Sequence, residues 1–156
     1  HSGVCDRAVS DGKVINSVSD IVLIHDAARP NLTEEMIQEC MNAVRNAGYD
    51  GAMPVLPMKD TVYMSSDGKK IDSLIDRSTV YAGQAPEVFV LDKYIQANKL
   101  LLPDRILSIN GSSEPAVMAG MNIALVHGDE NNYKITTKAD IERFIEECSG
   151  DSRWEK

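Results

Sequence analysis

A carboxylate and a guanidinium group lie close together after a short aliphatic run. Asp26 follows residues 21–24, which are Ile-Val-Leu-Ile, and Arg29 comes shortly before a helix start. Mg²⁺ prefers oxygen ligands such as carboxylates, and a guanidinium can bind phosphate through two parallel hydrogen bonds. These residues fit a site for a metal and a phosphate. They fit equally well a turn that Asp26 caps beside a solvated Arg29, so spacing alone leaves both interpretations open.

Lys134 is a second candidate for binding an anion. It lies in residues 132–137, Asn-Tyr-Lys-Ile-Thr-Thr, directly before a predicted helix. Free backbone N–H groups at a helix start attract anions, and a lysine there adds positive charge. Most lysines at helix starts are merely solvated, so this signal is weak by itself. Arg77, which follows Asp76, also has an ordinary interpretation as half of a surface ion pair worth about 0–1 kcal/mol.

Nucleophilic catalysis and a structural zinc site are not indicated. His25 fits a packed residue at a strand end with no nucleophile beside it, and His127 fits a loop. The cysteines, Cys5, Cys40 and Cys148, are far apart and lack Cys-x-x-Cys spacing. We expect free thiols in a reducing compartment, with Cys40 and Cys148 on the apolar faces of helices.

The elements that would position Asp26 and Arg29 form a strand–helix–strand unit. Residues 21–24 fit a strand buried on both faces, as in parallel sheets covered by helices. Thr33 is a good N-cap for a helix with an apolar stripe that ends near Gly48, and residues 52–57 fit the next strand. Both candidate residues would then lie past a strand's carboxyl end, where ligands bind in open α/β sheets.

A polar hairpin interrupts this pattern. Residues 61–64 and 71–75 flank a turn at Asp67-Gly68, and alternation around such a turn predicts two paired strands. We expect an arm that projects from the body over about residues 58–78. An isolated hairpin is only marginally stable, which favours a homodimer through this arm.

The rest of the chain returns to helices and strands. We expect helices over residues 91–102 and 113–119 and a strand over residues 122–126. Residues 137–140, Thr-Lys-Ala-Asp, resemble a capping box that opens a last helix. The apolar residues of that helix are expected to face inward: Ile141, Phe144, Ile145 and Cys148.

Composition narrows the classes of function. The chain has 156 residues, 43% apolar and 26% charged, which fits a single globular domain over residues 1–156. Its net charge of −8 argues against nucleic acid and anionic membranes as partners. No stretch is long and apolar enough to cross a bilayer. We therefore expect a soluble, cytoplasmic protein that acts on small molecules.

Two phosphate-binding motifs are missing from the sequence. It has no Walker A loop and no Gly-x-Gly-x-x-Gly between a strand and a helix. The chain also begins almost directly at a predicted central strand, where such folds usually place a first βα unit with its phosphate loop. We therefore expect that the N-terminus is truncated.

Five motifs occur in the order of a known family. They are residues 22–30 (Val-Leu-Ile-His-Asp-Ala-Ala-Arg-Pro), 57–61 (Pro-Met-Lys-Asp-Thr), 76–78 (Asp-Arg-Ser), 84–89 (Gln-Ala-Pro-Glu-Val-Phe) and 132–137. Together they resemble the 2-C-methyl-D-erythritol 4-phosphate cytidylyltransferases and the closely related ribitol-phosphate cytidylyltransferases. The resemblance runs from about Ile21 to Phe144. It implies an α/β, Rossmann-like fold with a mainly parallel sheet, helices on both faces and a projecting β-hairpin arm.

The resemblance also implies a reaction and its residues. A polyol phosphate attacks the α-phosphorus of CTP, pyrophosphate leaves, and Mg²⁺ assists. Asp26 is implied to hold the metal and the polyol, Arg29 to contact the substrate, and Lys134 to neutralise phosphate charge. The implied substrate-binding residues are Ala27, Thr61, Arg77, Asn110 and Thr136. Of these, Thr61 and Arg77 lie on the arm and would act in the partner's site of a homodimer.

The chain departs from the family pattern at several positions. The Gly-rich loop that grips the triphosphate has no counterpart, and the segment that helps recognise cytosine is matched only loosely by residues 3–10. Asn110-Gly111 replaces the usual Thr-Asp, and Ala85 replaces a threonine. These departures leave open which polyol phosphate is used.

Two hypotheses follow from these motifs. The first is a cytidylyltransferase for methylerythritol phosphate, in isoprenoid biosynthesis, or for ribitol phosphate. The second is a non-catalytic dimerisation or ligand-binding module, which the missing triphosphate loop and Asn110-Gly111 favour.

Overall fold

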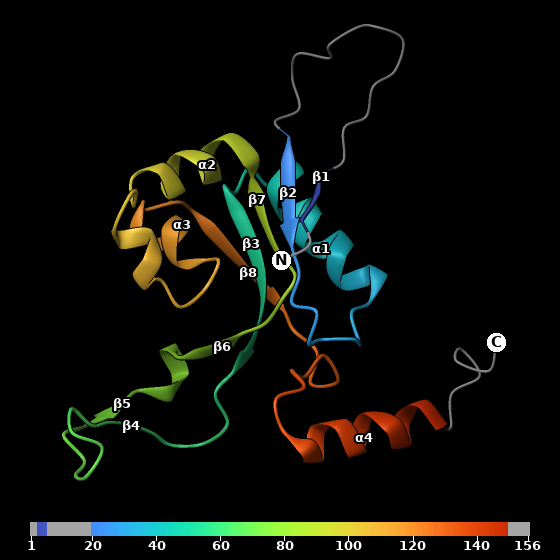
Figure 1. Ribbon diagram of the computed structural model, residues 1–156, viewed down its shortest axis with the longest axis vertical. Helices are drawn as coiled ribbons and strands as arrows, with labels where there is room; N and C mark the ends of the chain where they lie inside the picture. The colour runs from blue at the N-terminus through green and yellow to red at the C-terminus, as the bar shows by residue number, and fades with distance from the viewer. Residues whose placement is uncertain (1–2, 6–19, 150–156) are drawn as a thin grey trace, which may run out of the picture.

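The computed structural model describes residues 3–5 and 20–149, and it contains a twisted sheet with helices on both faces (Figure 1). Five strands of this sheet follow the hydrogen-bonded order β1–β2–β7–β3–β6. Strands β7 and β6 pair with successive parts of one edge of β3, and β8, the sixth strand, pairs with the opposite edge. Their bounds are β1 Gly3–Cys5, β2 Ile21–Ile24, β3 Gly51–Pro57, β6 Tyr81–Gly83, β7 Glu87–Val90 and β8 Ile123–His127. The predicted α/β class is confirmed.

The pairing of the strands corrects one expectation, because the sheet is mixed rather than mainly parallel. Among the described strands, β3 and β8 form the parallel pair, and the other pairings are antiparallel. Strands β2 and β3 run in the same direction, as the predicted strand–helix–strand unit requires, but β7 lies between them. Strand β7 was not predicted from the sequence, and its insertion converts a parallel neighbour pair into two antiparallel ones.

Alternation along β7 directs side chains to both layers of helices. Val88 faces helix α1 (Glu34–Arg45) and packs in a core with Cys40 and Val44 of that helix. Phe89 faces the other side, where its ring stacks on Tyr94 of helix α2 (Leu91–Lys99) with ring centroids 4.6 Å apart. Both β7 residues are fully buried. Figure 1 shows α1 on one side of the sheet and α2 with α3 (Glu114–Met118) on the other.

Helix α1 forms as expected because its ends carry the right residues. The Thr33 hydroxyl accepts a hydrogen bond from the Met36 backbone N–H, which satisfies one free donor of the first turn. After the helix, Gly48 has a φ of +75°, a conformation that suits glycine. Cys40 is buried in the core as predicted, and its burial raises the pKa of its thiol to about 12.

Close contact between β3 and β7 requires a glycine at position 51. A Cβ atom there would lie 2.5 Å from Cδ1 of Phe89 and 3.0 Å from the Val88 carbonyl oxygen. Such distances are too short for any carbon contact, so the side chain of Phe89 occupies the space that Gly51 leaves free. The backbone of β3 can therefore approach β7 only at a residue without a side chain.

The predicted arm is confirmed as a separate two-stranded sheet. Strand β4 (Val62–Met64) pairs antiparallel with β5 (Ser73–Ile75), and the short 3₁₀-helix η1 (Arg77–Thr79) follows. In Figure 1 the hairpin lies away from the main sheet, beyond β6. Large apolar side chains of this region are exposed: Tyr63, Met64, Ile71, Leu74 and Tyr81.

The last helix lies apart from the sheet, and the expected inward packing is wrong for Ile141 and Ile145, whereas Phe144 and Cys148 are half-buried. Helix α4 (Lys138–Ser149) has no buried residue, and the side chains of Ile141 and Ile145 are 48% and 57% exposed. On the side chain of Glu147, this helix accepts hydrogen bonds from Asn31 and Tyr133, which lie in loops. Over residues 20–149, where helices are described, none is long and apolar enough to span a membrane.

Candidate active site

A large pocket opens at the ends of the central strands. Its volume is about 1070 Å³, and its floor includes Ile24 of β2, Glu87 of β7 and Met53 of β3. Ile24 and Glu87 lie directly opposite each other in the β2–β7 register. The loop that follows β2 and the loop over residues 109–113 form further parts of its lining. The pocket lies past the carboxyl end of β2, a position where α/β sheets place ligands.

An ion pair joins two distant loops inside this pocket. Lys134 Nζ lies 2.7 Å from Asp26 Oδ2, and both side chains line the pocket. The hydrogen bond from Lys134 lowers the pKa of the Asp26 carboxyl, so Asp26 is ionised at neutral pH. The side chain of Asp26 is 34% exposed and that of Lys134 is 48% exposed, which leaves both accessible to a ligand. The arrangement offers a carboxylate and an ammonium group to the same bound molecule.

Arg29 attaches the same two loops to each other. Its guanidinium donates a hydrogen bond to the Asn132 backbone carbonyl, and the Ile135 N–H donates to the Ala28 carbonyl over 2.8 Å. Burial lowers the pKa of Arg29, although a guanidinium stays charged at neutral pH. Part of its role is therefore structural, because it fixes the loop that carries Lys134.

The buried amide of Gln84 holds the loop that leads to Lys134. Gln84 Nε2 donates to the carbonyl oxygens of Asp129 and Asn132 at 2.8 and 3.2 Å, and Oε1 accepts from the Asp129 N–H at 3.1 Å. Asn132 is fully buried, and its side-chain amide donates to the Ala85 carbonyl over 2.7 Å. Gly128 permits this packing, since a Cβ there would lie 2.5 Å from Gln84 Oε1. The loop is thus fixed by buried hydrogen bonds.

Asp140 in the first turn of α4 bonds the two residues that precede the helix. The Asp140 carboxylate accepts hydrogen bonds from the backbone N–H groups of Thr136 and Thr137, at 2.9 and 2.7 Å, and from both hydroxyls. The Asp140 N–H donates back to the Thr137 hydroxyl, which confirms the predicted capping box. These bonds lower the pKa of Asp140 to about 2. The N–H groups of Thr136 and Thr137 are therefore bonded to Asp140, and an anion at the first N–H groups of the helix itself stays a prediction.

Glu87 places a second carboxylate in the pocket. Its side chain accepts a hydrogen bond from the Ser112 hydroxyl, and the Ser112 carbonyl accepts one from the Tyr94 hydroxyl over 2.8 Å. Burial raises the pKa of Glu87, and the nearby charge of Asp26 contributes in the same direction. The loop over residues 109–113 is therefore held to the body from two sides.

The Asp26 carboxylate fits a magnesium ion whose other ligands are substrate phosphates and water. Within the part of the chain that the structure describes, no group of three or more His, Cys, Asp or Glu side chains could hold a metal. Mg²⁺ is commonly bound by one or two carboxylates together with substrate phosphates and water. Asp26, ionised and facing the pocket, meets that need.

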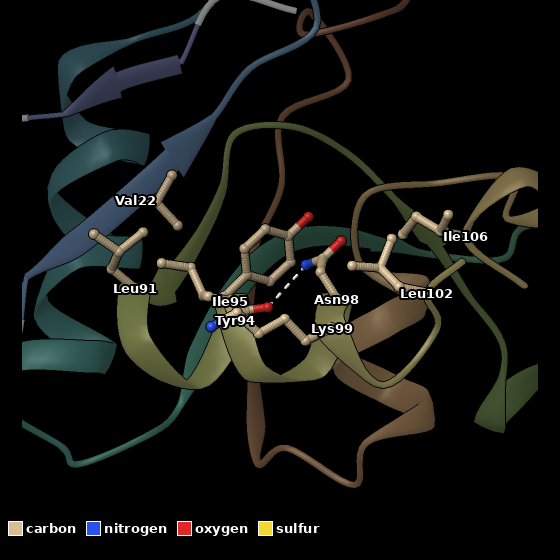
Figure 2. A pocket seen from close by; sticks show the side chains of 8 residues that line it. All are labelled: Val22, Leu91, Tyr94, Ile95, Asn98, Lys99, Leu102 and Ile106. Atoms are coloured by element: carbon tan, nitrogen blue, oxygen red, sulfur yellow. Dashed lines mark hydrogen bonds between the residues drawn. The ribbon is translucent and has the colours of Figure 1, made fainter. Parts of the chain in front are cut away.

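A second pocket has a different chemical character. Figure 2 shows it beside α2, lined mainly by apolar side chains from β2, α2 and the segment after α2, with a volume of about 390 Å³. The Asn98 amide there donates to the Tyr94 backbone carbonyl over 2.8 Å. The ammonium group of Lys99 is its charged component. It lacks the carboxylates and paired loops of the larger pocket.

Comparison with known proteins decides the family. The family model described as IspD, 2-C-methyl-D-erythritol 4-phosphate cytidylyltransferase, matches residues 5–145. The chain belongs to the IspD family.

Relatives agree with this assignment. A 2-C-methyl-D-erythritol 4-phosphate cytidylyltransferase from Roseobacter denitrificans is 34% identical over 84% of this chain and 56% of its own length. A bifunctional IspD/IspF enzyme from Maricaulis maris is 35% identical over 80% of this chain and 31% of its own length. The chain therefore spans about half the length of the first relative and about a third of the second.

Solved structures share the fold. The 4-diphosphocytidyl-2C-methyl-D-erythritol synthase from Anaerococcus prevotii has a TM-score of 0.71 and 27% identity, and the match covers 83% of this chain and 56% of that one. The Francisella tularensis IspD, at 22% identity, has a TM-score of 0.73 over 85% of this chain and 62% of that one. The mixed sheet with a separate hairpin is thus an IspD-like architecture.

The IspD-like pocket contains most of the predicted site residues. It brings together Asp26, Ala27, Arg29, Asn110 and Lys134. Thr61 and Arg77 lie on the arm and Thr136 lies at the cap of α4, and none of these three lines the pocket. The Arg77 guanidinium donates to the Lys59 carbonyl over 2.7 Å. Residues 6–10 of the loosely matched cytosine segment lie outside the described residues.

Sequence reasoning missed the residues that support the IspD-like site. Gln84 and Glu87 belong to a quoted motif, but neither was assigned a role there. Asn132 begins another motif and was likewise passed over. A glutamate at the start of the apolar run Val88-Phe89-Val90 is the signal that would have drawn attention to a carboxylate at the end of a buried strand. The hydrogen bonds of Gln84 required the folded structure.

Proposed function

We propose that the protein transfers CMP from CTP to a polyol phosphate and releases pyrophosphate. The observation that carries this proposal is the Asp26–Lys134 ion pair in a pocket that Arg29 also lines. Methylerythritol 4-phosphate is the first substrate to test, because the relatives' names specify it. Ribitol 5-phosphate is the second, because Asn110 and Ala85 differ from the family pattern at the pocket.

Chemistry of this kind depends on positioning and on charge neutralisation. A phosphate oxygen of the polyol displaces pyrophosphate at the α-phosphorus, and no covalent enzyme intermediate is needed. In this proposal Lys134 leaves its pairing with Asp26 to contact phosphate oxygens, and Arg29 contacts the substrate. A bound Mg²⁺ would supply positive charge at the phosphates and would be held by Asp26.

The arm supports a homodimer in which each site is completed by its neighbour. Thr61 and Arg77 lie on the hairpin at a distance from their own pocket, so a role in binding substrate requires a second copy. The exposed apolar side chains of β4 and β5 would be covered in such a dimer. In this proposal Thr61 and Arg77 contact the polyol phosphate in the partner's pocket.

A non-catalytic binding or dimerisation module is the alternative. Of the described residues that line the pocket, Arg29 and Lys134 are the basic ones, and each already has a partner within the chain. Two cations are few for a triphosphate and a second phosphate together. If the protein is such a module, substitution of Asp26 or Lys134 will leave its biological role intact.

The two functions are separated by one assay on the full-length protein. Its intact mass is determined first, and pyrophosphate release is then measured with CTP, Mg²⁺ and either methylerythritol 4-phosphate or ribitol 5-phosphate. Turnover that falls in Lys134→Ala but not in Lys138→Ala supports the cytidylyltransferase, since Lys138 is an exposed lysine nearby on α4. Absence of pyrophosphate release with every polyol phosphate would contradict it.

A further inference from the structure

We propose that Glu87 determines substrate specificity by accepting hydrogen bonds from the hydroxyl groups of the polyol. This inference rests on the proposed function, because it assigns a role within the same pocket. It divides the pocket into a side that binds phosphate, at Lys134 and Arg29, and a side that binds hydroxyl groups, at Glu87.

The register of the sheet places Glu87 next to the phosphate-binding side. Glu87 is the first residue of β7 and lies opposite Ile24, which precedes His25-Asp26 in the chain. Because β7 runs antiparallel to β2, the start of β7 meets the end of β2. Glu87 and Asp26 therefore line the same pocket, and the charge of Asp26 acts on the Glu87 carboxylate.

The partner of Glu87 is a hydroxyl group rather than a cation. Within residues 20–149, the ion pairs of the structure do not include Glu87, whereas Asp26 is paired with Lys134. Glu87 instead receives a hydrogen bond from the Ser112 hydroxyl. The surroundings of its carboxylate thus already resemble those that the hydroxyl groups of a polyol would provide.

The carboxylate retains capacity for a ligand. An ionised carboxylate offers roughly four lone-pair sites, and the Ser112 hydroxyl uses one of them. Burial of Glu87 makes its charge costly, and a further hydroxyl donor would offset part of that cost. A second phosphate at this position would be repelled by both Glu87 and Asp26. The pocket should therefore prefer a polyol monophosphate to a bisphosphate.

The substitution Glu87→Gln isolates the charge. Glutamine keeps an oxygen that accepts the Ser112 hydrogen bond, and Tyr94 holds the Ser112 carbonyl independently, so the loop should stay in place. Glu39→Gln, at an exposed position on α1, is the matched control. Ser112→Ala removes the loop contact but keeps the carboxylate, which separates a direct role from a role in holding the loop. Thermal unfolding checks that each variant is folded.

Calorimetric titration of the full-length protein in Mg²⁺, with and without a non-reactive CTP analogue, provides the test. The probes are methylerythritol 4-phosphate, butyl phosphate, which has no hydroxyl groups, and inorganic phosphate. We expect Glu87→Gln to weaken binding of methylerythritol phosphate by about 10-fold, since a charged acceptor forms the stronger hydrogen bond. Binding of butyl phosphate and inorganic phosphate should not change, nor should any binding change in Glu39→Gln.

The outcomes separate this inference from the proposed function. Wild-type protein that binds no polyol phosphate would overturn the proposed function and the role of Glu87 with it. If wild type and Glu87→Gln bind methylerythritol phosphate with equal affinity, the role of Glu87 alone is overturned. An equal loss in Ser112→Ala would also overturn it, because Glu87 would then act only by holding the loop.

Discussion

Lys134 Nζ lies 2.7 Å from Asp26 Oδ2, and this contact joins the loop after β2 to the loop before α4. Neither loop adopts its position from local sequence alone. Hydrogen bonds of Gln84 and Asn132 hold the loop before α4 to the segment before β7, and Arg29 bonds it to the loop after β2. The chemistry proposed for this pocket therefore depends on residues that do not themselves carry it.

Replacement of Lys134 by alanine should abolish most of the turnover. If Lys134 stabilises charge on the phosphates, its loss should lower kcat by about 100-fold or more. Pyrophosphate release by the full-length protein gives the measurement, and Lys138→Ala should keep the wild-type rate. A Lys134→Ala variant with unchanged kcat would exclude this residue from the reaction.

Replacement of Gln84 by leucine should destabilise the fold. Leucine fills a similar volume but cannot form hydrogen bonds. The Asp129 N–H and the carbonyls of Asp129 and Asn132 would therefore lose the partner that Gln84 provides. We expect the free energy of unfolding to fall by about 2–4 kcal/mol. Urea denaturation measures this change. Gln38→Leu, at an exposed position on α1, should change it little, and equal stability of both variants would contradict the role of Gln84.

Glu87 should make stability depend on pH. Its pKa in the folded protein lies above the ordinary 4.5, so the folded state binds the proton more tightly than the unfolded state does. The associated stability is present at pH below 4.5 and is lost as the pH rises through the folded pKa. The advantage of Glu87→Gln over wild type should therefore grow from pH 4 to pH 7. Unfolding measured at both pH values tests this, and a gap that narrows would contradict it.

Gly51→Ala should disturb the core between β3 and β7. The added methyl group would collide with the Phe89 ring and the Val88 carbonyl, and we expect a loss of about 1–3 kcal/mol. Gly111→Ala is the control, because a Cβ at Gly111 meets nothing within 4 Å. Thermal unfolding of the two variants should differ clearly. Equal melting temperatures would show that β7 can move away from β3 at little cost.

Leu74→Asp on the arm should weaken the proposed homodimer. Leu74 is 67% exposed in the single chain, and a charge buried against a second copy would be costly. Sedimentation analysis should show dissociation at concentrations at which the wild type is dimeric. Leu107→Asp, at an apolar residue after α2 that is 86% exposed, should leave the molecular mass of the assembly in solution unchanged. Equal effects of both substitutions would place the contact elsewhere.

Elements with strong local signals were predicted from the sequence. Helix α1 has a capping threonine and a long apolar stripe, and the arm has an Asp-Gly turn between alternating strands. Strand β7 was missed because it has four residues, begins with a charged one and follows Pro86. Its central place in the sheet, and hence the mixed pairing, results from contacts between segments far apart in the chain.

The candidate site divides in the same way. Asp26, Arg29 and Lys134 were expected from their motifs, and the structure brings them into one pocket. The capping box at Thr137 was expected too, whereas the additional hydrogen bond from the Thr136 N–H to Asp140 required the folded structure. The exposed apolar face of α4 could not be foreseen, because periodicity shows which residues share a face and not what covers that face.

The hydrogen bonds of Gln84 also determine at which stage the backbone around Lys134 loses its conformational entropy. Asn132 is fixed on one side of Lys134 and the capped Thr136 on the other, while the Ile135 N–H is bonded to Ala28. The backbone around Lys134 is thus ordered during folding. A ligand needs to immobilise only the side chain of Lys134, so less of its binding energy is spent on arranging the protein.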